Sequence, residues 1–166
     1  MNQTSQWLAM WQSEEISDEV LADHIAELVG SRDGSRGFFV VAMTSEIPLM
    51  DRLPEPLVSQ LRLAGPMVVD LTVRNLAMSS AMQVEHGRSG DPDKLEGSMR
   101  VQRRCRDLLQ VLDPELVVLR LETMKAATEG SGDDLEFLSR WNYDFDQRQA
   151  IKESVDVVLR GMGVKA

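Results

Sequence analysis

The chain has 166 residues, of which 27 are acidic and 18 are basic, so its formal net charge is −9. This length is typical of one domain. An acidic chain repels phosphates and anionic lipids, which argues against binding to nucleic acid or to a membrane surface. No stretch approaches the roughly 18 uninterrupted apolar residues of a transmembrane helix, and the first residues show no signal-peptide pattern. Because Cys105 is the only cysteine and so has no disulfide partner in the chain, we expect a cytoplasmic protein.

The N-terminal region is predicted to form two short helices. Residues 4–13 have the pattern of an amphipathic helix, with Trp7 and Trp11 one turn apart on the same side. Ser17 is a typical N-cap for the next helix, and Gly30 is a typical helix stop. We therefore expect the second helix to lie between these two residues.

The segment that follows is ambiguous. Residues 31–37 (SRDGSRG) are predicted to be a turn-rich connector. Residues 38–43 (FFVVAM) suit a strand by composition and a buried helix by periodicity. We favour the helix because no neighbouring segment resembles a second strand that could pair with it. A strand at 38–43 would instead make the fold α+β, and a further short helix is expected over 56–63.

A long apolar helix is predicted at the centre of the fold. Pro66 suits its first position, and the helix is expected to run to about His86, with Gly87 as its stop. Apolar side chains occur on most of its sides, which is typical of a buried helix. Two later Asp-Pro pairs predict the next two helices, which would begin at Pro92 and Pro114.

The C-terminal region is predicted to contain two more helices. The segment EGSGDD (129–134) is expected to be a flexible acidic hinge, and Asp133 or Asp134 would cap a short helix after it. Asp144 and Gln147 have the spacing of a capping box before the last helix.

These patterns together predict an all-α fold. We expect a single compact domain over residues 1–160, with seven or eight helices around the long central helix, and a frayed tail over residues 161–166. With 43% hydrophobic residues, the chain can build such a core without disulfides or metal.

Positive charge is concentrated in one predicted helix. Residues 51–110 carry a net charge of +1, whereas the regions on either side are acidic. Arg100, Arg103 and Arg104 share one sector of the helix, where they could bind an anion or an acidic partner. The alternative is that they pair with acidic side chains of the chain itself.

Trp7 and Trp11 form a second candidate surface. They could dock into a groove of a partner or mediate self-association. The alternative is that their helix folds back onto the core of the domain, because aromatic faces normally become buried.

No catalytic residue, metal site or cofactor is predicted. His24 and His86 are the only histidines, and the chain has no metal-binding pattern such as HExxH or CxxC. His86 is explained by the favourable position of a histidine at a helix C-terminus. Cys105 lies on the apolar side of its helix, so we expect an inert core thiol.

Four stretches resemble small uncharacterised helical proteins of cyanobacteria: FFVV (38–41), NLAMSSAMQVEHGRSGD (75–91), GSMRVQRRC (97–105) and YDFDQRQAI (143–151). The resemblance covers about half of the chain and includes no motif of known chemistry. It implies a cytoplasmic cyanobacterial protein and transfers no catalytic residue.

We interpret the sequence as that of a non-enzymatic protein that acts through a protein partner, as an adaptor, assembly or regulatory factor, or through a homo-oligomer. The alternative is an enzyme or a binding protein for a small molecule or an anion. Its pocket would lie between the helices over 66–86 and 92–112, where Asn75, Ser79, His86 and Arg103 would supply polar contacts.

Overall fold

The computed structural model describes residues 3–164, and within them every regular element is helical. This confirms the predicted all-α fold, including a helix over residues 38–43. The described elements are α1 (Gln3–Gln12), α2 (Asp18–Leu28), α3 (Arg32–Thr44), the short 3-10 helix η1 (Pro48–Asp51), α4 (Glu55–Leu63), α5 (Pro66–Ser89), α6 (Pro92–Val111), α7 (Pro114–Thr128), α8 (Leu135–Arg140) and α9 (Phe145–Gly161).

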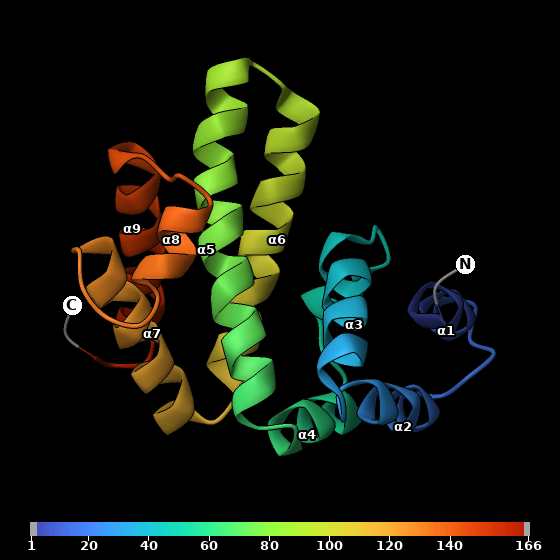
Figure 1. Ribbon diagram of the computed structural model, residues 1–166. Helices are drawn as coiled ribbons and strands as arrows, with labels where there is room; N and C mark the ends of the chain where they lie inside the picture. The colour runs from blue at the N-terminus through green and yellow to red at the C-terminus, as the bar shows by residue number, and fades with distance from the viewer. Residues whose placement is uncertain (1–2, 165–166) are drawn as a thin grey trace.

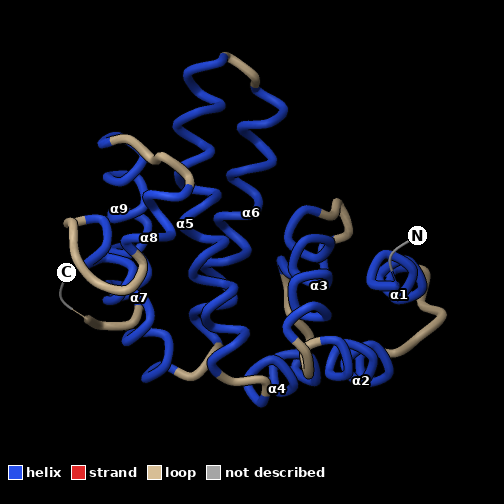
Figure 2. Tube along the Cα trace, viewed as in Figure 1, coloured by secondary structure: helices blue, strands red, loops and turns tan. Residues whose placement is uncertain are grey.

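An antiparallel hairpin of α5 and α6 is the centre of the molecule (Figure 1). Helices α7 and α9 pack against α5 on one side, with α8 beside them, and α3 packs against both hairpin helices on the other side. Helices α1, α2 and α4 extend the α3 side. Figure 2 shows that short loops connect these helices and that the tip of the hairpin projects beyond its neighbours.

Local capping explains where most of the helices begin. The side chain of Ser17 accepts a hydrogen bond from the backbone N–H of Val20, as the sequence predicted. Asp91 caps α6 in the same way, and a proline follows as the first helical residue. Asp144 and Gln147 form the predicted capping box of α9.

The predicted connector over 31–37 is wrong, because α3 begins at Arg32 and includes nearly all of it. Ser31 caps this helix by accepting a hydrogen bond from the N–H of Gly34. A Cβ at Gly34 would lie 2.1 Å from the carbonyl oxygen of Leu28, so this glycine permits close packing within a helix instead of marking a turn.

Two other predicted boundaries also differ. Helix α5 continues through Gly87 and ends before Gly90, whose φ of 67° gives the left-handed conformation of a C-cap. Asp134 makes no side-chain capping bond to α8 and is instead buried in an ion pair. Helix α9 ends at Gly161, and the last two residues of the predicted tail, 165–166, lie outside the described residues.

The described residues form one compact helical domain with a continuous apolar core. Its members come from the whole chain, for example Leu8 of α1, Phe38 of α3, Leu76 of α5 and Ile151 of α9. None of the helices over residues 3–164 is long and apolar enough to cross a membrane.

Candidate functional site

The guanidinium group of Arg104 donates hydrogen bonds to other groups of the same chain. Its side chain is fully buried, and Nε and Nη2 donate hydrogen bonds to the two carboxylate oxygens of Asp51 at 3.0 and 3.1 Å. Nη1 donates to the carbonyl oxygens of Ala42, Met43 and Ser45 at 2.6–3.1 Å. The guanidinium therefore ties α6 to the end of α3 and to η1, and it offers no surface to a partner.

The other two predicted arginines lie around the same end of α3. Arg103 is 59% exposed, and its Nη2 lies 3.6 Å from the Asp51 carboxylate. Arg100 Nη1 lies 3.5 Å from the carbonyl oxygen of Thr44. The hydrogen bonds from Arg104, together with the nearby charge of Arg103, hold the pKa of Asp51 below its ordinary value. The structure thus brings these arginines together around Asp51 and Thr44.

The two tryptophans of α1 are half-buried and pack against the core. The Trp7 ring stacks on the ring of His24, with their centroids 4.5 Å apart. Trp11 donates a hydrogen bond from Nε1 to the Asp18 carboxylate at 2.8 Å. Both side chains therefore have partners within the domain.

The residues of the predicted alternative pocket do lie together. Asn75, Ser79 and His86 line an open groove of about 300 Å³ along one face of the α5–α6 hairpin, whereas Arg103 is not among the lining residues. We call this feature the hairpin groove. Its lining residues are Thr44, Asn75, Met78, Ser79, Met82, His86, Lys94, Gly97, Ser98 and Val101.

Hydrogen bonds within the hairpin fix the polar side chains of the groove. His86 Nδ1 and Ser98 Oγ share a hydrogen bond of 2.8 Å that joins α5 to α6. Asn75 donates from Nδ2 to the carbonyl oxygen of Leu71, so its Oδ1 remains able to accept. Imidazole Nε2 of His86 likewise has no partner among the described residues.

The charge of the hairpin groove differs from that of the chain as a whole. Although the chain has a net charge of −9, no described residue that lines the groove is a carboxylate. Its titratable groups are His86 and Lys94 at the tip end, and Arg100 contacts Thr44 at the other end. Met78, Met82 and Val101 are the large apolar residues of its lining.

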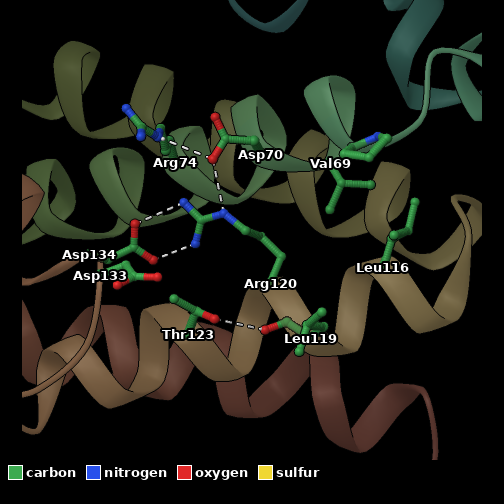
Figure 3. A pocket seen from close by; sticks show the side chains of 10 residues that line it. Val69, Asp70, Arg74, Leu116, Leu119, Arg120, Thr123, Asp133 and Asp134 are labelled. Atoms are coloured by element: carbon green, nitrogen blue, oxygen red, sulfur yellow. Dashed lines mark hydrogen bonds and ion pairs between the residues drawn. The ribbon is translucent and has the colours of Figure 1, made fainter.

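A second hollow, of about 350 Å³ between α5 and α7, is lined by both acidic and basic side chains (Figure 3). Both carboxylate oxygens of Asp134 accept hydrogen bonds from Arg120, and Arg120 Nε donates to Asp70 at 2.9 Å. Arg74 lies 3.4 Å from the same Asp70 oxygen. These charges neutralise one another, so the cluster anchors the 129–134 segment to α7.

Sequence reasoning missed this cluster, although a signal was present. Arg120 interrupts the apolar run LVVLRL (116–121), and a lone charge in a core-facing helix needs a buried partner.

A family model matches residues 1–158 of the chain, with the description "Uncharacterised conserved protein UCP020893". The chain belongs to this family. The expectation of membership in an uncharacterised family is therefore confirmed. None of the curated proteins and none of the solved structures matches the chain.

Two observations concern metal-ligating and thiol side chains in the part of the chain that the structure describes. Residues 3–164 contain no group of three His, Cys, Asp or Glu side chains arranged to hold a metal ion. Cys105 is completely buried, and this burial raises the pKa of its thiol well above the ordinary value. The hairpin groove is the hollow in which three residues of the predicted pocket, Asn75, Ser79 and His86, lie together.

Proposed function

We propose that this protein binds a partner protein, whose acidic amphipathic segment lies in the hairpin groove. The observation that carries the proposal is the composition of the groove. It is largely apolar, no carboxylate lines it, and Lys94 and Arg100 lie at its two ends, with Lys94 also 4.0 Å from the Asp91 carboxylate, in a chain whose net charge is −9. Charge of one sign around an apolar patch favours a partner of the opposite sign.

The apolar part of the groove suits the side chains of a helix. Met78, Met82 and Val101 form adjacent walls, and methionine adapts its shape to different apolar side chains. The lining of α6 extends from Lys94 to Val101, which is about 10 Å at the helical rise of 1.5 Å per residue. A groove of that length accepts two turns of a partner helix through its i, i+3, i+4 and i+7 positions.

The charged ends of the groove favour an acidic partner. Lys94 and His86 lie at the tip end, and Arg100 lies beside Thr44 at the opposite end. Acidic side chains on the partner would meet Lys94 and Arg100 at the rim, where such contacts chiefly raise the association rate and set orientation.

The openness of the groove favours a protein segment over a small molecule. Met82 is 37% exposed and the Lys94 side chain is 70% exposed, so one long side of the groove faces solvent. Small-molecule sites usually bury most of the ligand surface. We expect the interaction to occur in the cytoplasm, where the free thiol of Cys105 would remain reduced.

The test is photocrosslinking in the native cell with benzoylphenylalanine at Met82. A matched control carries the crosslinker at Leu63, which is 80% exposed at the end of α4. We expect capture of a protein only from Met82, through a peptide that is rich in Asp and Glu and has apolar residues at helical spacing. Lys94→Glu should reduce this capture.

The following results would overturn the proposal. These are no protein crosslinked at Met82, equal capture from Leu63, and a captured peptide with a net positive charge. Recovery of a small molecule instead of a peptide would support the alternative pocket interpretation and equally reject a protein partner.

A further inference from the structure

Gly97 is an unexpected residue in the wall of the hairpin groove. It lies well inside α6, and it is one of the residues that line the groove. Glycine is unfavourable inside a helix, because its backbone loses more conformational freedom than that of alanine and it supplies no side chain for packing. The presence of glycine at this position therefore needs an explanation in packing or in binding.

Internal packing does not explain this glycine. A Cβ at Gly34 would lie 2.1 Å from the carbonyl oxygen of Leu28. One at Gly161 would lie 2.8 Å from the side-chain nitrogen of Gln110. A Cβ at Gly97, in contrast, would have no atom of the described chain within 4 Å beyond its own stretch of α6. Because the fold leaves this space open, the glycine keeps room for a group from outside the domain.

Three side chains surround this space, which we call the Gly97 notch. Lys94 lies one turn before Gly97 on the same helix. His86 lies across from it on α5, because its Nδ1 shares a hydrogen bond of 2.8 Å with Oγ of the adjacent Ser98. Met82 precedes His86 by one turn of α5 and lines the same groove. The notch therefore has a floor of backbone and walls formed by a lysine side chain, an imidazole ring and a thioether.

These three side chains all interact favourably with aromatic rings. A methionine sulfur makes favourable contacts with ring edges, and an ammonium group is attracted to the face of a ring. An imidazole stacks on other rings, as His24 does in this protein with Trp7 at a centroid distance of 4.5 Å. None of the described lining residues carries a carboxylate, which would repel the negative face of a ring. The walls therefore favour an aromatic group over an aliphatic group of the same size.

We propose that the Gly97 notch receives an aromatic side chain of the acidic partner segment. The ring lies on the backbone of α6 at Gly97, between Met82 and His86, with Lys94 at its outer face. The aromatic anchor rests on the function proposed above and adds to it that the segment has a Phe, Tyr or Trp among its apolar positions. Aromatic anchors in pockets are typical of the residues that dominate binding at protein interfaces.

The test is a titration with para-cresol, which has the side-chain ring of tyrosine, and with the corresponding methylcyclohexanol, which has a saturated ring. NMR follows the methionine methyl signals and the ring C–H signals of His86. We expect para-cresol to shift the signals of Met82 and His86 saturably, and the methylcyclohexanol to bind at least about threefold more weakly. The signal of Met99, which lines a separate hollow against α9, should stay unchanged.

Two leucine variants form a matched pair. Gly97→Leu fills the notch and should abolish the saturable shifts, whereas Gly87→Leu should bind para-cresol as the wild type does. Gly87 is also helical and has open space around it, but it does not line the groove. Both variants should unfold at a urea concentration no lower than the wild type, because leucine favours a helix more than glycine does. The smaller change Gly97→Ala should weaken binding at least about threefold.

The outcomes separate the aromatic anchor from the proposed function. Absence of saturable shifts, equal binding of the saturated ring, or unchanged binding by Gly97→Leu would each overturn the anchor. An acidic segment that is captured by crosslinking at Met82 and contains no aromatic residue would overturn it as well. Capture at Met82 together with a failed para-cresol titration would reject the anchor alone, whereas no capture at Met82 would reject the proposed function and the anchor with it.

Discussion

Arg104→Ala should be among the most damaging single substitutions in the protein. The wild-type guanidinium is 1% exposed and makes five hydrogen bonds. Two go to Asp51, and three go to carbonyl oxygens at the end of α3. Alanine would leave the carboxylate without its main partner and the buried carbonyl groups without a donor.

The structure allows the size of this effect to be estimated. Removing one member of a buried ion pair typically costs about 3–5 kcal/mol of unfolding free energy. The Asp51 side chain is 32% exposed, so water can partly rehydrate its carboxylate, and we expect a loss near the lower limit, about 3 kcal/mol. The control, Arg103→Ala, removes only a 3.6 Å contact at the surface and should cost less than about 1 kcal/mol.

Urea unfolding at neutral pH, followed by far-UV circular dichroism, measures both values. The pKa of Asp51 is lowered mainly by Arg104, so the ion pair stabilises the fold above the unfolded pKa of 3.8. This contribution is lost as the pH falls through the lower folded pKa. The unfolding free energy of Arg104→Ala should therefore fall less on acidification than that of the wild type. A cost for Arg104→Ala within about 0.5 kcal/mol of that for Arg103→Ala would refute this reasoning.

Three further experiments test separate parts of the fold. In urea unfolding, Gly87→Ala should stabilise the protein by about 0.5–1 kcal/mol because α5 has room for a Cβ at this position. Gly90→Ala should destabilise it by about 1 kcal/mol because the φ of Gly90 is 67°. Equal effects of the two substitutions would contradict the end of α5 at Ser89. The Cys105 thiol should react with Ellman's reagent in urea and hardly at all in the native protein, and rapid native reaction would contradict its burial. Arg120→Met should cost about 3 kcal/mol because it leaves a buried carboxylate unpaired, whereas the exposed Arg140→Met should cost less than about 0.5 kcal/mol; similar costs would contradict a structural role for the cluster.

Helix starts were predictable because their signals are local. Ser17 and the Asp144–Gln147 pair satisfy backbone groups within three residues, so the sequence alone identifies them. The helix through Gly34 was not predictable in this way. Its glycine packs closely against Leu28, and that contact depends on how α2 and α3 meet.

For the candidate sites too, contacts between residues far apart in the chain could not be predicted from the sequence. The sequence placed Asn75, Ser79, His86 and Arg103 in one alternative pocket, and the structure shows that the first three line one groove whereas Arg103 does not. The partner of Arg104 could not be identified in advance, because Asp51 is 53 residues away in the chain and is brought close only by the packing of η1 on α6.

Binding at the hairpin groove is tested most directly by NMR of the methionine methyl groups. The titrant is a synthetic peptide of the segment that crosslinks to Met82. We predict saturable shifts of the Met78 and Met82 methyl signals, no shift of the buried Met124 signal, and binding about tenfold weaker in Lys94→Glu. Shifts confined to Met99, on the opposite face of the hairpin, or no shift at Met78 and Met82, would contradict the account.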